Sequence, residues 1–272
     1  MDLFNKYAII GGMPEVIQHY LADNSAANLP KIYESIWSTY AADTEKYTTN
    51  SSERNVMRHI MNTVAFEVDK RVKFQNFGNS TYKSREVGEA MRSLEMAKVI
   101  QLIYPTTSVS PPIVPDFKKS PRVQLLDTGI INYSLGIISE MLLMDNLIGT
   151  YKGAIIPHLI FQDLISLQAE KDETPHFWVR EKRQSSAEVD LVYSMHGKII
   201  PIEIKSGATG SLKSLHQFIE KSEHSYAVRI YGGEFEIIEA KTPGGKPYIL
   251  MNLPYYLGTK ISEYLSYFLE NY

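Results

Sequence analysis

Two carboxylates and a lysine occur in this chain at spacings that suit the binding of a divalent cation. Asp190 lies within the apolar segment 187–193, and Glu203 and Lys205 lie within the apolar segment 199–205. Both segments have the alternating pattern of β-strands, in which side chains two residues apart share a face. Glu203 and Lys205 are therefore expected on one face of their strand, and the isoleucines that alternate with them on the other.

A tight turn around His196-Gly197 would join the two segments into an antiparallel hairpin. Asp190 then lies directly opposite Glu203, with the two Cβ atoms about 5 Å apart, whereas a bulge would shift this pairing by one residue. Opposed carboxylates repel each other unless a cation or a proton intervenes. Lys205 supplies one positive charge, and Mg²⁺ or Mn²⁺ would supply the rest, because such an ion binds one or two carboxylates together with waters and phosphate oxygens.

These residue types predict metal-assisted hydrolysis of a phosphodiester. The metal would activate water, and Lys205 would orient that water or neutralise the charge that develops on the phosphate. The same three residues also fit an ordinary surface hairpin with a cross-strand ion pair. Both interpretations stay open on the residues alone.

The second half of the chain predicts an α/β core around this hairpin. A helix over 154–168 has a broad apolar face, and a second helix is predicted over 211–221, a third over 260–272. Helices mixed with short apolar strands are typical of an α/β domain. The strands are predicted at 176–180, 188–195, 198–205, 225–231, 234–240 and 246–251.

The first half reads as helices, followed by a helix and a strand in direct succession. Helices are predicted from Met13-Pro14 onward, over 29–40, and from Ser51 to near Lys70. A further helix opens at 83–86 and leads into a strand at 97–104, and the loop 105–121 contains five prolines. This order is the outline of a winged helix-turn-helix, with the loop as the wing or as a linker. A small packing or protein-docking domain is the alternative, because basic and acidic residues alternate along the helix.

Composition limits the classes of function. The net charge is −3 and neither half is basic, so any nucleic-acid binding has to come from a local patch. The chain has no cysteine and no apolar run near the ~20 residues that cross a bilayer. Residues 1–6 lack the pattern of a signal peptide, so none is expected. A cytoplasmic protein without a membrane partner is expected. Its histidines, including His158, His176 and His216, show no ligand spacing and are predicted in loops or at the surface.

Glu188-Val189-Asp190 and, after a spacer, Glu203-Ile204-Lys205-Ser206 form the most specific pattern, and it resembles the PD-(D/E)xK nuclease-like superfamily. Together with 177–180, the region is similar to the C-terminal domain of a large group of prokaryotic AAA-type ATP-binding proteins. Gly11-Gly12-Met13-Pro14 looks like the junction at which the ATPase part of that family ends. The segment 84–104 is similar to the family's winged-helix-like insert, so the resemblance covers nearly the whole chain.

The resemblance implies an α/β (α+β) protein, the C-terminal part of a longer ATPase-family protein. Residues 1–145 would form a helical, winged-helix-like domain. Residues 146–272 would form a restriction-endonuclease-like α/β domain with a mixed central sheet. It implies that Asp190 and Glu203 bind Mg²⁺ or Mn²⁺ and that Asp190, Glu203 and Lys205 are catalytic.

The sequence departs from this family in two ways. No GxxxxGK[ST] loop occurs, so the chain has no ATP site of its own. Gln162 follows Phe161 where the family usually has Glu. Its amide oxygen is expected to act as an auxiliary metal ligand, with one formal charge fewer, while Asp163 lies about 100° round the helix.

Two functions follow. The chain is either a Mg²⁺-dependent DNA endonuclease or a catalytically degenerate nuclease-like fold. The degenerate fold would dock DNA or a protein and regulate the missing ATPase domain. The sequence carries no indication of oligomeric state.

Overall fold

The computed structural model divides into two compact units, each assembled from two stretches of chain. Unit 1 comprises Met1–Leu102 and Ser120–Gln162, and unit 2 comprises Ile103–Lys119 and Asp163–Tyr272. The predicted boundary between residues 145 and 146 lies outside the described residues and stays a prediction. The structure describes residues 2–23, 25–46, 48, 50–143, 149–168, 174–180, 187–207 and 210–272.

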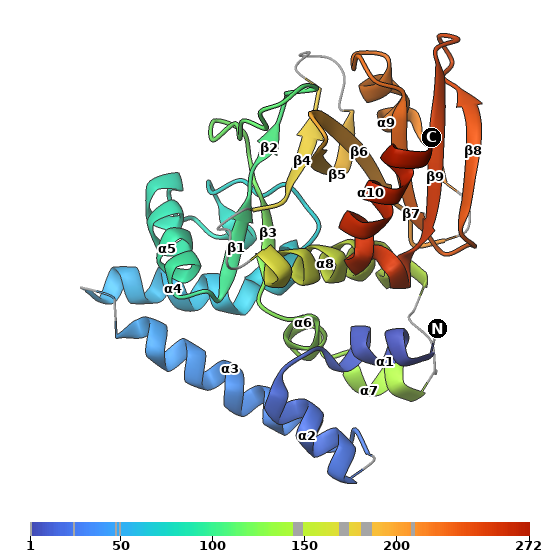
Figure 1. Cartoon of the computed structure of the whole chain (residues 1–272). Coiled ribbons are helices and arrows are strands. Elements are labelled where there is room, and N and C mark those ends of the chain that lie inside the picture. The colour runs from blue at the N-terminus through green and yellow to red at the C-terminus, as the bar shows by residue number, and fades with distance from the viewer. Residues whose placement is uncertain are drawn as a thin grey trace. The chain divides into compact units, whose positions relative to one another are not determined.

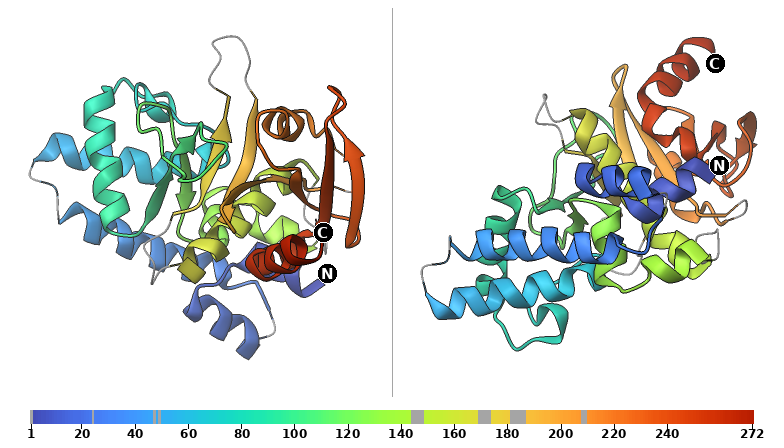
Figure 2. Two further views of the ribbon diagram at one scale, coloured as in Figure 1. Left: turned by 45° about the horizontal axis from the view of Figure 1, so that its top comes forward. Right: turned by 90° about the horizontal axis from the view of Figure 1, so that it is seen from below.

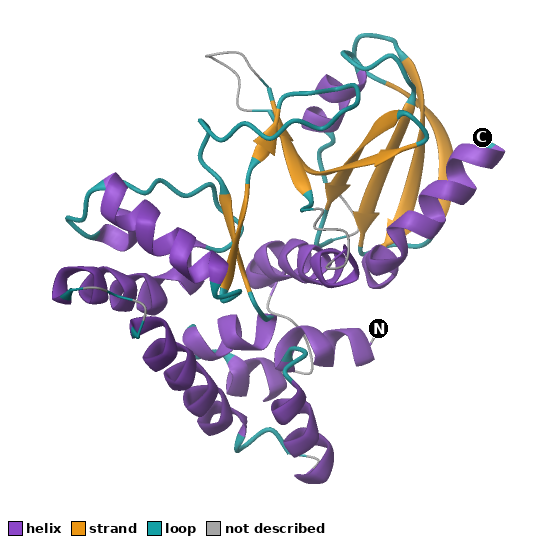
Figure 3. Ribbon diagram, turned by 60° about the vertical axis from the view of Figure 1, so that its left-hand side comes forward, coloured by secondary structure: helices purple, strands orange, loops and turns teal. Residues whose placement is uncertain are grey.

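Unit 1 is mainly helical (Figures 1 and 3). Helix α8 continues into unit 2 after Gln162. The helices are α1 (Asp2–Ile10), α2 (Pro14–Asp23), α3 (Leu29–Glu45), α4 (Ser51–Thr63), α5 (Ser84–Met96), α6 (Thr128–Ser134), α7 (Ile138–Leu143) and α8 (Gly149–Gln168). Short 3₁₀ turns are η1 (Val64–Glu67) and η2 (Phe77–Asn79).

Helices α4 and α5 pack against each other through apolar faces (Figure 1). The Asn50 side chain accepts a hydrogen bond from the Glu53 N–H and so caps α4. The fully buried residues Ile60, Met91 and Leu94 recur at helical spacing on the facing sides. Helix α4 ends at Thr63 and passes into η1, so the predicted extension to near residue 70 is wrong.

The strand predicted after α5 is present as β1 (Ile100–Ile103), and it pairs with β3 (Arg122–Leu125). The proline-rich segment joins these two paired strands, and it is more than a plain linker. It contributes strand β2 (Pro105–Thr106) to the sheet of unit 2. Pro105 is tolerated because β2 is an edge strand, where a missing N–H need not break a ladder on both sides.

Unit 2 is built on a mixed seven-stranded sheet in the order β2-β4-β5-β6-β7-β9-β8, and Figure 1 labels these strands. Neighbours β2/β4, β6/β7 and β7/β9 are parallel, and β4/β5, β5/β6 and β8/β9 are antiparallel. Strands 4 to 9 are β4 (His176–Val179), β5 (Glu188–Met195), β6 (Lys198–Ile204), β7 (Tyr226–Tyr231), β8 (Glu236–Lys241) and β9 (Pro247–Pro254).

Two helices cover opposite faces of this sheet: α9 (Lys213–Ile219), which connects β6 to β7, and α10 (Ile261–Asn271), which follows the 3₁₀ turn η3 (Tyr255–Lys260) (Figures 1 and 2). Ala227 packs with Leu215 of α9, while the neighbouring Tyr226 stacks edge-to-face on Phe268 of α10, with ring centroids 5.4 Å apart. Adjacent residues of a strand point to opposite faces, so the two helices lie on opposite sides.

The mixed α+β fold and all three strands around the candidate site are confirmed, each to within one residue. The prediction for His158 is wrong. It lies in α8 and is buried, with Nε2 at 3.2 Å from the Leu125 carbonyl oxygen. His176 lies in β4 and His216 in α9 rather than in loops. Among the described residues, none of the helices combines the length and apolarity needed to cross a membrane.

Candidate metal and phosphodiester site

The turn between β5 and β6 determines which residues of the two strands face each other. His196 and Gly197 have φ of 47° and 69°. Positive φ at both central residues is typical of the tight hairpin turns that match strand twist. The paired residues run from Met195↔Lys198 to Leu191↔Ile202, and this is the register predicted from the sequence.

Asp190 lies one step beyond the last of these pairs, at an irregularity of β5. The pairing of β5 with β4 shifts between His176↔Val192 and Trp178↔Val189, so β5 has one residue more than β4 there. The Asp190 carboxylate oxygen Oδ2 accepts a hydrogen bond of 2.9 Å from the Ile204 N–H. The side chain of Asp190 therefore links β5 to the end of β6.

Glu203 and Lys205 lie on either side of Ile204 and form an ion pair. The Lys205 Nζ donates to Glu203 Oε1 at 2.5 Å, and the two side chains are 26% and 7% exposed. A buried carboxylate is stable only with such compensation. The aliphatic part of Lys205 runs along Gly210, where an added Cβ would lie 2.8 Å from the lysine Cδ.

The structure thus brings Asp190, Glu203 and Lys205 together at the carboxyl end of β6. Ile199 of β6 packs with Phe218 of α9, so the residues that alternate from Ile199, including Glu203, face the α9 side of the sheet. Among the described residues, no group of three or more His, Cys, Asp or Glu is placed to hold a metal ion. One or two carboxylates can hold Mg²⁺ together with waters and phosphate oxygens, and the metal site at these residues stays a prediction.

Gln162, the fourth residue predicted from the sequence, has hydrogen-bond partners within unit 1. Its Oε1 accepts from the Thr128 N–H at 3.0 Å, and its Nε2 donates to the Tyr7 hydroxyl at 3.3 Å. These bonds give the amide a structural role at the start of α6 that the sequence did not reveal. Its role as a metal ligand stays a prediction.

The sequence also did not indicate Asp127, a buried carboxylate in unit 1. Asp127 is 2% exposed and caps α6 by accepting from the Gly129 N–H at 2.8 Å. It accepts from the Gly12 N–H at 2.6 Å, and an added Cβ on Gly11 would lie 2.6 Å from its carboxylate carbon. Burial raises the pKa of the Asp127 carboxyl, against the effect of these backbone donors. The Gly11-Gly12 pair is therefore explained by packing around Asp127.

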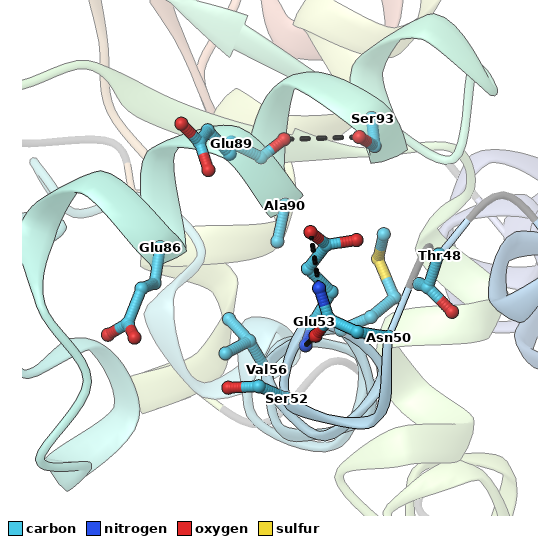
Figure 4. A pocket seen from close by; sticks show the side chains of 10 residues that line it. Thr48, Asn50, Ser52, Glu53, Val56, Glu86, Glu89, Ala90 and Ser93 are labelled. Atoms are coloured by element: carbon cyan, nitrogen blue, oxygen red, sulfur yellow. Dashed lines mark hydrogen bonds between the residues drawn. The ribbon is translucent and has the colours of Figure 1, made fainter.

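The groove between α4 and α5 is acidic (Figure 4). Its glutamates serve the fold: Glu53 accepts from the Asn50 side chain, Glu86 accepts from the Lys83 N–H, and Glu89 pairs with Arg85. Lined by three carboxylates, this groove does not suit a phosphate backbone, which binds to cationic surfaces.

Fold and site together define an α+β protein that carries two carboxylates and a lysine at the end of a mixed sheet. Residues 1–140 match the family described as Domain of unknown function (DUF8612), and the chain belongs to this family. Residues 152–243 match Domain of unknown function (DUF4143), a domain often found C-terminal to AAA ATPase domains. That match includes Asp190, Glu203 and Lys205. No curated protein and no solved structure matches the chain.

Proposed function

We propose that the site on β5 and β6 binds a divalent cation, Mg²⁺ or Mn²⁺, and hydrolyses DNA phosphodiesters. The observation that carries the proposal is the convergence of three groups on one short backbone segment. Asp190 bonds to the Ile204 N–H, and the Glu203–Lys205 ion pair flanks the same residue. Two carboxylates and one cation in this space suit a hard metal and an anionic substrate.

Each residue has a distinct task in this proposal. Asp190 and Glu203 would hold the metal, which when bound supplies an activated water and polarises the phosphoryl oxygen. Lys205 would move its ammonium group from Glu203 to the phosphate and stabilise the charge that develops there. The water oxygen forms the new bond to phosphorus and loses a proton to solvent. The bond between phosphorus and the sugar oxygen breaks, and that oxygen leaves with the bonding pair and takes a proton from solvent.

Plasmid nicking in Mg²⁺ and Mn²⁺ tests this function directly. The wild type is expected to nick plasmid, and Lys205→Ala to lose that activity, while Lys213→Ala, a change at an exposed lysine on α9, retains it. Gln162→Glu restores the acidic residue at that position and is run alongside. If neither the wild type nor Gln162→Glu nicks plasmid with either metal, the catalytic proposal is abandoned.

Calorimetry tests the metal site separately from turnover. Titration with Mn²⁺ is expected to show binding that Asp190→Asn removes, because one of the two carboxylates is lost. Binding that survives this change would place the ion elsewhere.

The second candidate is a binding module that works with an AAA-type ATPase. It is favoured by the match to DUF4143 and by the Glu203–Lys205 pair, in which each charge already has an internal partner. DNA affinity that falls steeply with salt and ignores metal, without nicking, would support docking of DNA. Docking of the ATPase domain instead would appear as a shift in its rate of ATP hydrolysis when this chain is added. A cytoplasmic location belongs to both proposals.

A further inference from the structure

A row of polar side chains extends from Glu203 across the sheet of unit 2. Glu203 of β6 is paired with Arg229 of β7, and Arg229 is paired with Asn252 of β9. Paired residues on neighbouring strands point to the same face, so the three side chains lie side by side. They lie at the carboxyl ends of three parallel strands, the edge at which open α/β sheets bind their ligands.

Arg229 is held in one orientation. Its Nε donates to the Asn252 Oδ1 at 2.7 Å, and its guanidinium carbon lies 4.3 Å from the ring centroid of Tyr231. Asn252 is fully buried and Tyr231 is 8% exposed, so both supports are fixed by packing. The hydrogen bond and the aromatic ring together define the plane of the guanidinium group.

The two Nη atoms of Arg229 form the outer edge of this guanidinium group. In the described part of the chain, no hydrogen bond or ion pair engages the two Nη atoms of Arg229. Asn252 Nδ2 is likewise buried there without an acceptor. Buried donors need partners, and a planar guanidinium edge with two donors matches the oxygens of a phosphate or carboxylate.

We propose that Arg229, oriented by Asn252 and Tyr231, binds a phosphate group of a nucleic-acid strand beside the Glu203–Lys205 site. This proposal rests on the proposed function, since it takes the substrate to be a phosphodiester. Arg229 is one strand away from Glu203, and adjacent strands lie about 4.8 Å apart. It would therefore contact the phosphate at or next to the bond to be cut, and fix the register of the strand.

Binding without metal separates this proposal from catalysis. The probe is a short fluorescein-labelled thymidine oligonucleotide in EDTA, titrated with protein and followed by fluorescence polarisation at several salt concentrations. Arg229→Met is expected to weaken binding about tenfold or more, because a charged hydrogen-bonding pair is lost. The slope of log affinity against log salt should fall by about 0.7, the value for one phosphate contact on a single strand.

Two further variants complete the design. Asn252→Asp keeps the side-chain shape but places a carboxylate against Arg229, and it should weaken binding as much as Arg229→Met. Lys241→Met removes a charge at the opposite end of the sheet, beside Pro247, and should leave affinity unchanged. Thermal unfolding establishes that each variant is folded.

The outcomes are distinguishable from those of the nicking assay. Weaker binding with a smaller salt slope in both site variants supports the phosphate contact, even if the protein nicks no DNA. Unchanged affinity and slope in the folded Arg229→Met and Asn252→Asp proteins overturn the proposal, even if metal-dependent nicking is present. Absence of any oligonucleotide binding by the wild type overturns it as well.

Discussion

Replacing His158 by glutamine tests how strongly a buried imidazole limits the stability of the protein in mild acid. His158 is 3% exposed, and its Nε2 lies 3.2 Å from the Leu125 carbonyl oxygen. A carbonyl only accepts, so Nε2 carries a proton and donates it to this oxygen. Burial lowers the pKa of His158 to about 3.

The magnitude follows from the difference between folded and unfolded chains. An unfolded histidine has a pKa near 6.5 and takes up a proton between pH 7 and 5, whereas folded His158 does not. Because the pKa is depressed on folding, its contribution is intact above the unfolded value and is lost as pH falls toward the folded one. The loss between pH 7 and 5 is about 2 kcal/mol of unfolding free energy.

Urea denaturation at pH 7 and pH 5 measures this loss. Glutamine does not titrate, and its amide N–H₂ can still donate toward Leu125. The wild type is therefore expected to lose about 2 kcal/mol more than His158→Gln between the two pH values. Burial also lowers the pKa of His176 and His224, but both proteins share these groups and their effects cancel. Equal losses in the two proteins would refute the buried neutral imidazole.

Three further predictions concern the two clusters of polar residues. Gly11→Ala is expected to destabilise unit 1 by about 3 kcal/mol or more, because φ is +66° and the new Cβ displaces the Asp127 carboxylate from its buried donors. Thermal unfolding measures both variants: Gly136→Ala, at φ +70° with open space around it, should lower the free energy of unfolding by only about 1 kcal/mol. Equal losses of unfolding free energy in the two variants would contradict the contact with Asp127. Burial raises the pKa of Asp127, so the stability it contributes is complete below the unfolded value of about 3.9 and is lost as pH rises through the folded one. Asp127→Asn should remove this part of the pH dependence of the urea unfolding midpoint. A pH dependence equal to that of the wild type would contradict the raised pKa of Asp127. Gly210→Ala should shift the Lys205 side chain and lower nicking with little loss of stability, whereas nicking equal to that of Gly136→Ala would show that Lys205 needs no such support.

The strand register at the candidate site was predictable because its determinants are local. Alternation along two apolar segments placed Glu203 and Lys205 on one face, and a short turn with Gly197 left little freedom in the register. From these two facts the pairing of Leu191 with Ile202 follows. The irregularity at Asp190 was not predictable, since it arises from the pairing of β5 with β4 and leaves no trace in the sequence of β5.

The other contacts that the sequence did not predict all involve partners distant in sequence. His158 was predicted in a loop or at the surface because the histidines show no ligand spacing, and its contact, the Leu125 carbonyl, is distant in sequence. The hydrogen bonds of Gln162 depend on Thr128 and Tyr7. Arg229 has no local pattern at all, and only the strand order sets it beside Glu203. Periodicity detects which face of an element is apolar, but it does not detect which distant element completes a polar group.

The small strand β2 has a consequence for how the protein is made. The segment 103–119 supplies the edge of the unit 2 sheet: the Trp178 Nε1 donates to the Thr107 carbonyl, and Val109 and Ile113 pack on the cluster around Trp178. During synthesis the segment 103–119 leaves the ribosome before β4 to β9, the strands whose sheet it completes. The second stretch of unit 1, residues 120–162, is made in between. A gene divided between the two family matches would leave residues 103–119 in the N-terminal product, separated from the rest of the unit 2 sheet. The interleaving therefore means that residues 103–119 and the strands they pair with have to be present in one chain.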